Sequence, residues 1–393
     1  MSTLRALPLP QPGQKLLAHS EQLRGVIAAR IQATGPMPFH DYMELALYHP
    51  ELGYYSAGLP KFGPAGDYIT APELGPVFAC CLARSMAATL QDCAPAQILE
   101  IGAGSGALAV DLLLELERLD TPPAGYWILE RSADCRARQR ETLQQRAAHW
   151  LPYVLWLDTP PKDPFDGVII GNEVVDALAV HGFEMAADRV RERMVGLDDA
   201  GQFRWDQRPA DARLRIAVRC LEAQIGHPLP PGYCSEINLH LEPWLSSIAT
   251  SLRRGLVLLS DYGYPRAAFY QPSHARGTLI CHFQHRVHDD PFVFPGLQDI
   301  TAFVDFSALA EAGCASGLDL LAYGPQAGFL LANGLDDIGQ RIVELGPLEA
   351  MRLSQEIKTL TLPEEMGERF QIMAFGRGKV DAVAMLSDWT HQL

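Results

Sequence analysis

The chain has 393 residues, of which 48% are hydrophobic and 20% are charged, so it is long enough to bury a large core. Its 32 basic and 47 acidic residues give a formal net charge of −15, which argues against a general nucleic-acid binder but leaves a cationic ligand open. The eight cysteines form no CxxC pair, which favours reduced thiols in a cytoplasmic compartment. We expect no signal peptide and no membrane span.

Residues 1–94 are expected to form an N-terminal extension of helices and glycine-rich segments. EQLRGVIAARIQATG has the apolar periodicity of a helix. It is followed by GYYSAGLPKFGPAGDYITAPELG, a long stretch rich in glycine, proline and aromatic residues. So long an irregular stretch is typical of a functional segment or of disorder, and its aromatic content makes disorder the weaker interpretation.

Residues 95–393 show the alternation of an α/β domain. The short apolar runs QILEI, YWILE, YVLWL and GVIIG are separated by helical patterns such as LAVDLLLELERL. This succession predicts a mainly parallel sheet. Further strands are expected in GLVLLSDYG, LDLLAYG and FQIMAFG. Segments at about 182–235 and 265–315 interrupt the pattern, and we interpret them as insertions.

A glycine-rich turn joins the first of these strands to its helix in LEIGAGSGALAV. Gly102, Gly104 and Gly106 would let the backbone approach a ligand at the start of the helix. Their spacing is GxGxG, so the dinucleotide fingerprint GxGxxG is not met. Glu100 precedes the turn within the strand. Its carboxylate would repel a pyrophosphate and attract the amino group of a methionyl moiety.

Acidic residues also end the next two strands. Glu130 ends YWILE, where a carboxylate can accept hydrogen bonds from two ribose hydroxyls, and Asp158 follows YVLWL near the expected position of an adenine amine. The combination predicts S-adenosylmethionine (SAM) as the cofactor, in preference to NAD or to a turn that binds no ligand. For Asp158 alone, an ordinary exposed loop carboxylate explains the residue almost as well.

The fourth strand ends in the polar cluster GNEVVDAL, in which Asn172, Glu173 and Asp176 follow an apolar run. Such groups are costly to desolvate. A capped loop explains the cluster, and so does a site that faces a ligand at the carboxyl edge of the sheet.

Several long motifs resemble the MidA-like methyltransferases, in the same order and over nearly the whole chain. They are YHPELGYYS, FGPAGDYITAPELGPVFA, LEIGAGSG, GNEVVDALAVHGFE, LLSDYGY, the segment from GTLICHFQ to VDFSAL, and YGPQAGFLL. Val174, Val175 and Ala179 depart from the residues usual in the family, which puts the shape of the substrate pocket in question. The resemblance implies a seven-stranded, Rossmann-like class I methyltransferase sheet with an N-terminal helical extension and inserted substrate-facing segments.

The resemblance also implies a function. Mitochondrial members methylate an arginine of a core subunit of respiratory complex I, so we expect a bacterial, cytoplasmic protein arginine methyltransferase that acts on a subunit of the NADH dehydrogenase. It further implies that GDYITAPE folds over SAM, with Asp67, Thr70 and Glu73 lining the pocket. A purely structural turn is the alternative for each of these residues.

For an arginine substrate, carboxylates can hold the planar guanidinium and orient one nitrogen toward the methyl group. We assign the main contact to Glu173 and a second one to Asp176, whose alternative role is a charge at a helix N-terminus. Asn172 is expected to bond the SAM carboxylate or to hold the loop. His181 is a candidate acceptor for the proton lost on methylation, or a buried hydrogen-bonded histidine without chemistry.

Three histidines, His282, His285 and His288, lie in CHFQHRVHDD, but methyl transfer needs no metal, and we predict none. Two other functions remain open at this point. One is a methyltransferase for a small molecule or another side chain, and the other is a SAM-binding assembly chaperone with little turnover. The oligomeric state also stays open, a homodimer included.

Overall fold

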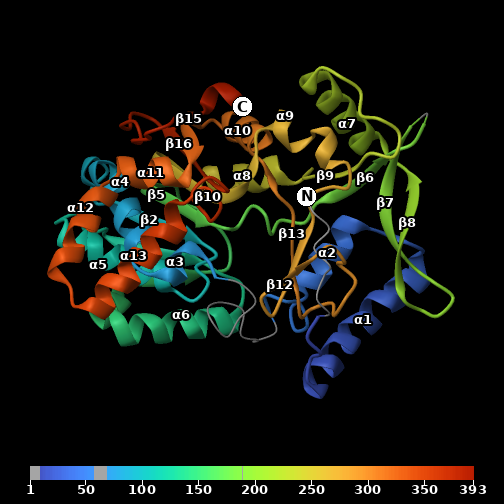
Figure 1. Cartoon of the computed structure of the whole chain (residues 1–393), viewed down its shortest axis with the longest axis horizontal. Helices are drawn as coiled ribbons and strands as arrows, with labels where there is room; N and C mark the ends of the chain where they lie inside the picture. Colours follow the sequence, from blue (N-terminus) through green and yellow to red (C-terminus); the bar gives the residue numbers. More distant parts are fainter. Residues whose placement is uncertain (1–8, 57–68, 188) are drawn as a thin grey trace. The chain divides into compact units, whose positions relative to one another are not determined.

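The computed structural model describes residues 9–56, 69–187 and 189–393, which divide into two compact units (Figure 1). The first unit comprises the described residues of Met1–Tyr68, Ala177–His240 and Arg266–Phe303. The second unit comprises Ile69–Asp176, Leu241–Pro265 and Val304–Leu393. The expected extension, 1–94, therefore contributes to both units, and the expected insertions overlap the later two stretches of the first unit.

The second unit is built on a mixed sheet with a path of seven strands in the order β15-β16-β10-β5-β2-β3-β4, and β14 pairs with β10 off this path. The pairs β2–β3, β2–β5, β3–β4 and β5–β10 are parallel, whereas β16 is antiparallel to β10 and β15. This confirms the α/β fold, and the seven expected strands form the path of a sheet that has β14 as an eighth strand. The strands are β2 (Gln97–Ile101), β3 (Gly125–Leu129), β4 (Val154–Leu157), β5 (Phe165–Asn172), β10 (Leu252–Tyr264), β14 (Val304–Asp305), β15 (Asp319–Pro325) and β16 (Phe370–Arg377).

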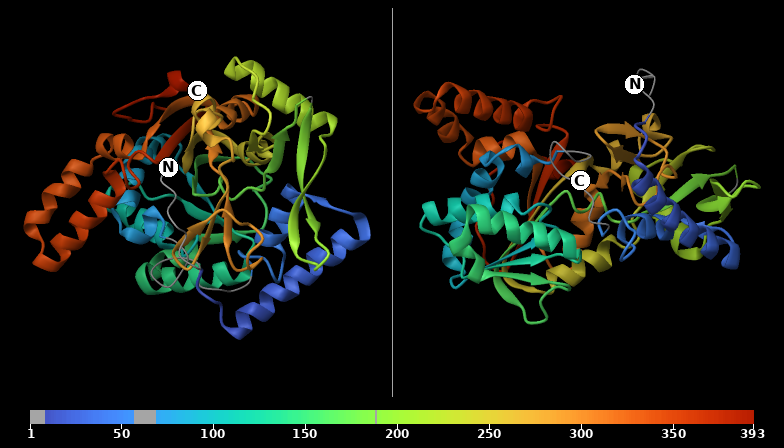
Figure 2. Two further views of the ribbon diagram at one scale, coloured as in Figure 1. Left: turned by 45° about the vertical axis from the view of Figure 1, so that its right-hand side comes forward. Right: turned by 90° about the horizontal axis from the view of Figure 1, so that it is seen from below.

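The central strands read as continuous apolar runs because helices cover the sheet, as the two views of Figure 2 show. Ile98, Val168 and Leu258 lie in the same core as side chains of α4 and α5. The helices of this unit are α3 (Ala71–Leu74), α4 (Val77–Asp92), α5 (Ala107–Arg118), α6 (Ala133–Arg146), α8 (Leu241–Ala249), α10 (Phe306–Ala315), α11 (Gln326–Ala332), α12 (Leu335–Gln340) and α13 (Pro347–Thr361), with 3-10 turns η1 (Ala148–Tyr153), η3 (Arg341–Glu344) and η4 (Thr390–Gln392).

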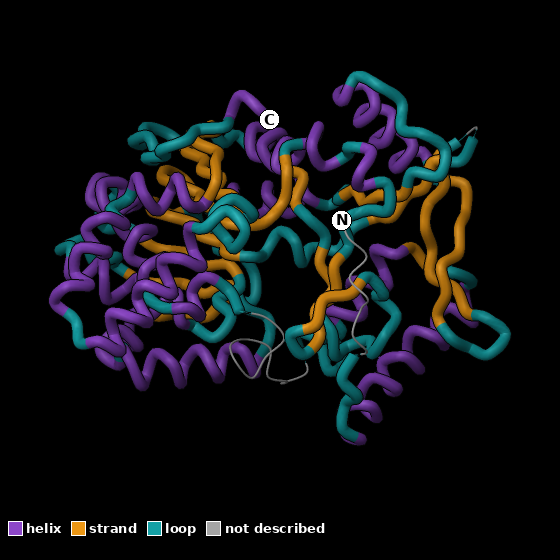
Figure 3. The backbone as a smooth tube through the Cα atoms, in the orientation of Figure 1, coloured by secondary structure: helices purple, strands orange, loops and turns teal. Residues whose placement is uncertain are grey.

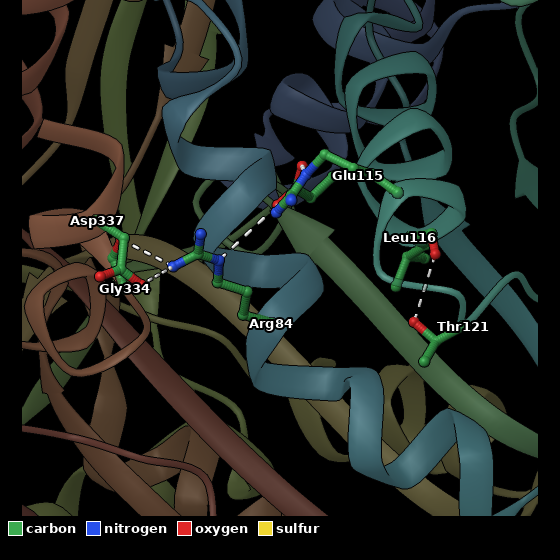
Figure 4. Close-up of polar contacts among 7 residues, drawn as sticks. Arg84, Glu115, Leu116, Thr121, Gly334 and Asp337 are labelled. Carbon is green, nitrogen blue, oxygen red and sulfur yellow. Dashed lines mark hydrogen bonds and ion pairs between the residues drawn. The ribbon is translucent and has the colours of Figure 1, made fainter. Parts of the chain in front are cut away.

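One charged side chain ties three of these helices together, as Figure 4 shows. Arg84 of α4 donates to the carbonyl oxygen of Gly334, before α12, and to the carboxylate of Asp337 in α12, both at 3.0 Å. It also forms an ion pair with Glu115 of α5 at 3.8 Å. Because the guanidinium presents several donors in a fixed plane, a single arginine can satisfy partners on different elements.

The first unit has two small sheets, β1-β7-β6-β9 with β8 beside β7, and β12-β11-β13 (orange in Figure 3). In its long N-terminal helix, Leu23, Ile27 and Ile31 are buried at the spacing of one helix face, and the helix ends where Gly35 adopts a φ of 83°. The elements are α1 (Gln14–Thr34), β1 (Met37–Pro38), α2 (Phe39–Tyr48), β6 (His181–Met185), β7 (Val190–Leu197), β8 (Phe203–Pro209), α7 (Ala212–Ile225), β9 (Cys234–Ile237), α9 (Arg266–Phe269), η2 (Pro272–His274), β11 (Ile280–Phe283), β12 (Arg286–His288) and β13 (Asp299–Thr301).

Within the described parts of the chain, no helix combines the length and the apolar character that crossing a membrane requires.

Candidate active site

The glycine turn between β2 and α5 adopts a conformation that favours glycine at all three of its glycine positions. Gly102, Gly104 and Gly106 have φ angles of 64°, 53° and 87°. A Cβ on Gly106 would lie 3.0 Å from the Cα of Gln139, a backbone atom that cannot move aside easily. The turn therefore brings main chain, without side chains, to the carboxyl edge of the sheet where open α/β folds bind ligands.

Gln139, in α6, holds this turn in place through hydrogen bonds. Its Nε2 donates to the carbonyl oxygen of Gly104 at 3.1 Å and to the carboxylate of Glu130 at 3.2 Å. Its Oε1 accepts a hydrogen bond of 2.9 Å from the indole N–H of Trp156. The side chain is fully buried. Sequence reasoning missed this residue, because a glutamine in the polar helix ADCRARQRETLQQRA carries no signal of burial.

Glu100 lies inside β2 with 2% of its surface exposed. Its carboxylate accepts a hydrogen bond of 2.8 Å from the hydroxyl of Tyr126 on the neighbouring strand β3. Burial raises the pKa of Glu100 to about 8, the hydrogen bond from Tyr126 acts in the opposite direction, and the charge of Glu130 raises the pKa further. A buried carboxylate in this state gains stability from a cationic partner, such as an ammonium group.

The two acids that follow the next strands have different surroundings. Glu130, after β3, is half-buried and accepts hydrogen bonds from the N–H of Ser132 at 2.9 Å and from Gln139. Asp158, after β4, has 79% of its side chain exposed and pairs with Arg136 at 2.6 Å. Glu130 is thus held in a defined position beside the glycine turn, whereas Asp158 has the environment of a surface carboxylate.

The segment before α4 also reaches the glycine turn. Thr70 is buried and immediately precedes α3, and its carbonyl oxygen accepts the N–H of Glu73 at 3.0 Å. The carboxylate of Glu73 accepts a short hydrogen bond from the hydroxyl of Ser105, in the middle of the turn. Asp67, the other residue expected here, lies outside the described residues.

The polar cluster at the end of β5 forms a tight turn. Asn172 is the last residue of β5, and its amide donates to the carboxylate of Glu173 at 3.2 Å. Glu173 has a φ of 52°, rare for a residue with a side chain, and its N–H donates to the carbonyl oxygen of Ser260 at 2.8 Å. Asp176 is buried. No helix starts at Asp176, so the alternative of a helix N-terminal charge does not apply.

Asp261, in β10, holds this turn in place. One of its carboxylate oxygens accepts the N–H groups of Val174, Val175 and Asp176 at 3.2, 2.8 and 3.2 Å. The other oxygen accepts the N–H of Tyr262 at 3.0 Å. Three successive backbone donors directed at one oxygen form an anion-binding nest, here occupied by a side chain of the protein. Asp261 follows an apolar strand in LLSDYGY, but its role as the anchor of another loop was not evident from the sequence.

The electrostatics of this cluster favour a cation. Burial first, and then the carboxylates of Asp176 and Glu173, raise the pKa of Asp261 well above its usual range, while hydrogen bonds from Val175 and Tyr262 act in the opposite direction. Near this cluster, the Oδ1 of Asn172 is buried and has no hydrogen-bond partner among the described residues. A ligand with positive charge and N–H donors would relieve the repulsion and satisfy this oxygen.

The cluster and the glycine turn are neighbours in the second unit. β2 and β5 pair directly, with Ile101 opposite Gly171. A Cβ placed on Gly102 would lie 3.1 Å from the Cγ1 of Val174. A group held on the glycine turn therefore lies beside the acids that follow β5.

His181, the remaining candidate, belongs to the first unit as the first residue of β6. Its ring lies against those of His40 and His240, with centres 4.7 and 5.5 Å away. Burial, followed by the charges of these two histidines, lowers the pKa of His181 to about 4.

Comparisons with known proteins point to one activity. A family model described as "S-adenosyl-L-methionine-dependent methyltransferase" matches residues 81–345. The protein arginine methyltransferase NDUFAF7 of Danio rerio is 28% identical over 88% of this chain and 85% of its own length, and the human protein is 26% identical over 93% and 84%. A crystal structure from Burkholderia thailandensis, bound to S-adenosyl-homocysteine (SAH), is 40% identical with a TM-score of 0.91, covering 98% of this chain and all of that one.

Proposed function

The chain belongs to the MidA-like family of SAM-dependent methyltransferases, and from this premise we propose that it methylates an arginine side chain of a protein. SAM is its methyl donor. The relatives named as protein arginine methyltransferases support the choice of substrate, and the acidic turn of Asn172, Glu173 and Asp176 is the observation that carries it.

The reaction needs little covalent help from the protein, because the sulfonium already activates the methyl group. A guanidinium nitrogen attacks the methyl carbon, the C–S bond breaks, and its electron pair stays on sulfur to give SAH. The nitrogen then loses a proton, and the product is a methylated guanidinium that is still cationic. The protein must hold the nitrogen in line with the S–C bond, within about 3–3.5 Å of the carbon.

We assign this positioning to Glu173, with Asp176 as a second contact. A guanidinium nitrogen is a poor nucleophile because the positive charge is delocalised over the group. Carboxylates that grip two of the nitrogens localise the charge there and leave the third better able to react. The bond from Asn172 and the unusual backbone of Glu173 support this assignment, because they fix the direction of the carboxylate.

On the donor side, we assign the methionyl amine to Glu100, the ribose hydroxyls to Glu130, and close backbone approach to Gly102, Gly104 and Gly106. Thr70 and Asn172 are proposed to line the same pocket, and Asp67 lies outside the described residues. The exposure of Asp158 and its ion pair with Arg136 favour a surface role for that residue over an adenine contact.

The released proton is proposed to pass to water. The sequence predicts His181 either as the acceptor of this proton or as a buried histidine without chemistry. Burial and the charges of His40 and His240 lower its pKa to about 4, which makes it a weak base and favours the second role. The resemblance to the MidA-like family further supports a subunit of a respiratory NADH dehydrogenase as the protein substrate.

The proposal is tested with labelled SAM and a protein extract from cells that lack this enzyme. We expect label in methylarginine of one protein, identified by mass spectrometry of its peptides. Label confined to small molecules, or to another side chain, would overturn the arginine assignment and leave the methyltransferase activity intact.

A second experiment separates catalysis from a chaperone role. Glu173→Gln keeps the size of the side chain and removes its charge, so we expect methylation to fall about a hundredfold or more while the affinity for SAH changes by less than about threefold. Glu364→Gln, an exposed carboxylate on the same unit, is the matched control. Full complementation of a deletion strain by Glu173→Gln would favour a SAM-binding scaffold.

A further inference from the structure

Three histidines that are far apart in the sequence meet in the first unit. His40 is the second residue of α2, His181 opens β6, and His240 is the last residue of the stretch 177–240. Antiparallel pairing of β6 with β9 places His181 opposite Ile237, which brings the end of that stretch to the same place. Helix α2 packs on β6 and supplies the third ring.

The three ring centres form a triangle, and the ring planes are nearly parallel, with angles of 26° between His40 and His181, 27° between His40 and His240 and 7° between His181 and His240. Their centres are 4.7 Å apart for His40 and His181, 4.6 Å for His40 and His240, and 5.5 Å for His181 and His240. One ring nitrogen from each lies within 4.8 Å of the others. Zn²⁺ binds imidazole nitrogen at about 2.0–2.1 Å, so three rings converging on one ion have their centres about 5 Å apart. The ring centres lie near this spacing. Binding of an ion requires the side chains to rotate, so that nitrogens now within 4.8 Å of one another approach to roughly 3.4 Å.

The protonation states suit metal binding. Burial lowers the pKa of His181 to about 4, and burial also lowers the pKa of His240. Neutral imidazole is the form of histidine that binds metal ions, and burial favours this form in both rings. The Nδ1 of His181 is buried and has no hydrogen-bond partner among the described residues, whereas the exposed side of His240 gives an ion a path to the cluster.

A carboxylate lies behind the third ring. The Nδ1 of His40 is 3.2 Å from the Oδ1 of Asp41, and the other oxygen of Asp41 is 3.2 Å from Arg30. With Nδ1 donating to Asp41, the Nε2 of His40 is left to bind an ion. This carboxylate–histidine pairing is the usual outer support of protein metal sites. Arg213, whose charge lowers the pKa of both His181 and His240, opposes a cation here.

We propose that His40, His181 and His240 bind one divalent transition-metal ion, Zn²⁺ by preference, with water in the fourth position. Three imidazole nitrogens bind Zn²⁺ and other late transition-metal ions better than Mg²⁺ or Ca²⁺, which prefer oxygen ligands. The ion joins both ends of the stretch 177–240 to helix α2 and so stabilises the first unit. This cluster is distinct from His282, His285 and His288. Among the described residues, those three histidines do not form a group whose ligand atoms lie close enough together to hold one ion.

The test uses full-length protein without a histidine tag, stripped of metal by a chelator and dialysed. Zn²⁺ titrated into this protein is expected to bind one ion per chain by calorimetry and to raise Tm. Co²⁺ is expected to give the visible absorption of a tetrahedral site. If Zn²⁺ does not bind, the proposed site is wrong. If Zn²⁺ binds without a change in Tm, the stabilising role is wrong.

Matched variants locate the ion. His240→Gln, at an exposed ligand, is expected to weaken Zn²⁺ binding at least about tenfold, and Asp41→Asn about tenfold through the His40 ring. Arg213→Gln should strengthen binding, because it removes the opposing charge. His227→Gln, an exposed histidine of the same unit outside the cluster, should bind like the wild type. Equal affinities in wild type and His240→Gln would refute the assignment, and unchanged SAH binding shows that each variant is folded.

Discussion

Replacing Glu100 by glutamine should make the ligand-free protein more stable and its cofactor binding weaker. The pKa of Glu100 rises from an ordinary value of 4.5 to about 8 in the fold, mainly through burial. Between these two values the folded state holds a proton that the unfolded state has lost. Stability therefore falls as pH rises through this window and levels off above about pH 8.

The size of the effect follows from the two pKa values. Burying Glu100 costs about 1.4 kcal/mol at pH 5.5 and about 4 kcal/mol at pH 8, so the wild type loses roughly 3 kcal/mol across this range through this group alone. Glu100→Gln has no proton to lose, and its amide oxygen can still accept the hydroxyl of Tyr126. The variant should gain about 2–3 kcal/mol relative to the wild type as the pH is raised from 5.5 to 8.

Urea unfolding of both proteins at the two pH values measures this difference, because every other titrating group is common to both. An equal stability difference at pH 5.5 and pH 8 would show that Glu100 is already ionised in the fold. Calorimetry with SAH supplies the second half of the test. Loss of a charge-assisted contact to the methionyl amine should weaken binding about tenfold to a hundredfold. Unchanged affinity would remove Glu100 from the cofactor site.

Two further substitutions test the scaffold. Gly106→Ala places a Cβ 3.0 Å from the backbone of Gln139 at a residue whose φ is 87°. We expect the free energy of unfolding in urea to fall by about 1–3 kcal/mol and SAH binding to weaken at least tenfold. An unchanged Tm would contradict the argument that the alanine is strained. The carboxylate of Glu356 accepts the N–H of Val77 at 2.7 Å, at the start of α4. Replacing Glu356 by alanine should lower the free energy of unfolding by about 1–3 kcal/mol, and replacing it by glutamine should lower it much less. Equal Tm values for the two Glu356 variants would show that the hydrogen bond contributes nothing.

The seven strands of the large sheet were predictable because each is a short apolar run between turn or helix signals. Burial on both faces makes such runs stand out in a sequence, as in FDGVII and GLVLLSDYG. The glycine turn was equally legible, since its conformation requires glycine at fixed positions. These features depend on local chemistry, which is why the sequence carries them.

The supporting contacts were not predictable, because they join residues from distant elements. Asp261 binds the backbone N–H groups of residues 174–176, and any polar side chain of suitable length at the end of β10 would look the same in the sequence. Gln139 lies on a helix whose other residues are mostly polar, so nothing marks it as buried. The meeting of His40, His181 and His240 depends on the pairing of β6 with β9, which is set by the tertiary fold.

Both units are assembled from three separate stretches of the chain, and this constrains how the protein can fold. Helices α1 and α2 are synthesised well before β7, yet the strand between them, β1, pairs with β7 through Met37 and Val195. The second unit needs β16, near the carboxyl end, to join β10 and β15. Neither unit can complete its sheets until most of the chain exists, so the nascent protein exposes apolar surface for an unusually long time. Truncation at either end should therefore yield aggregation-prone fragments instead of an independent domain.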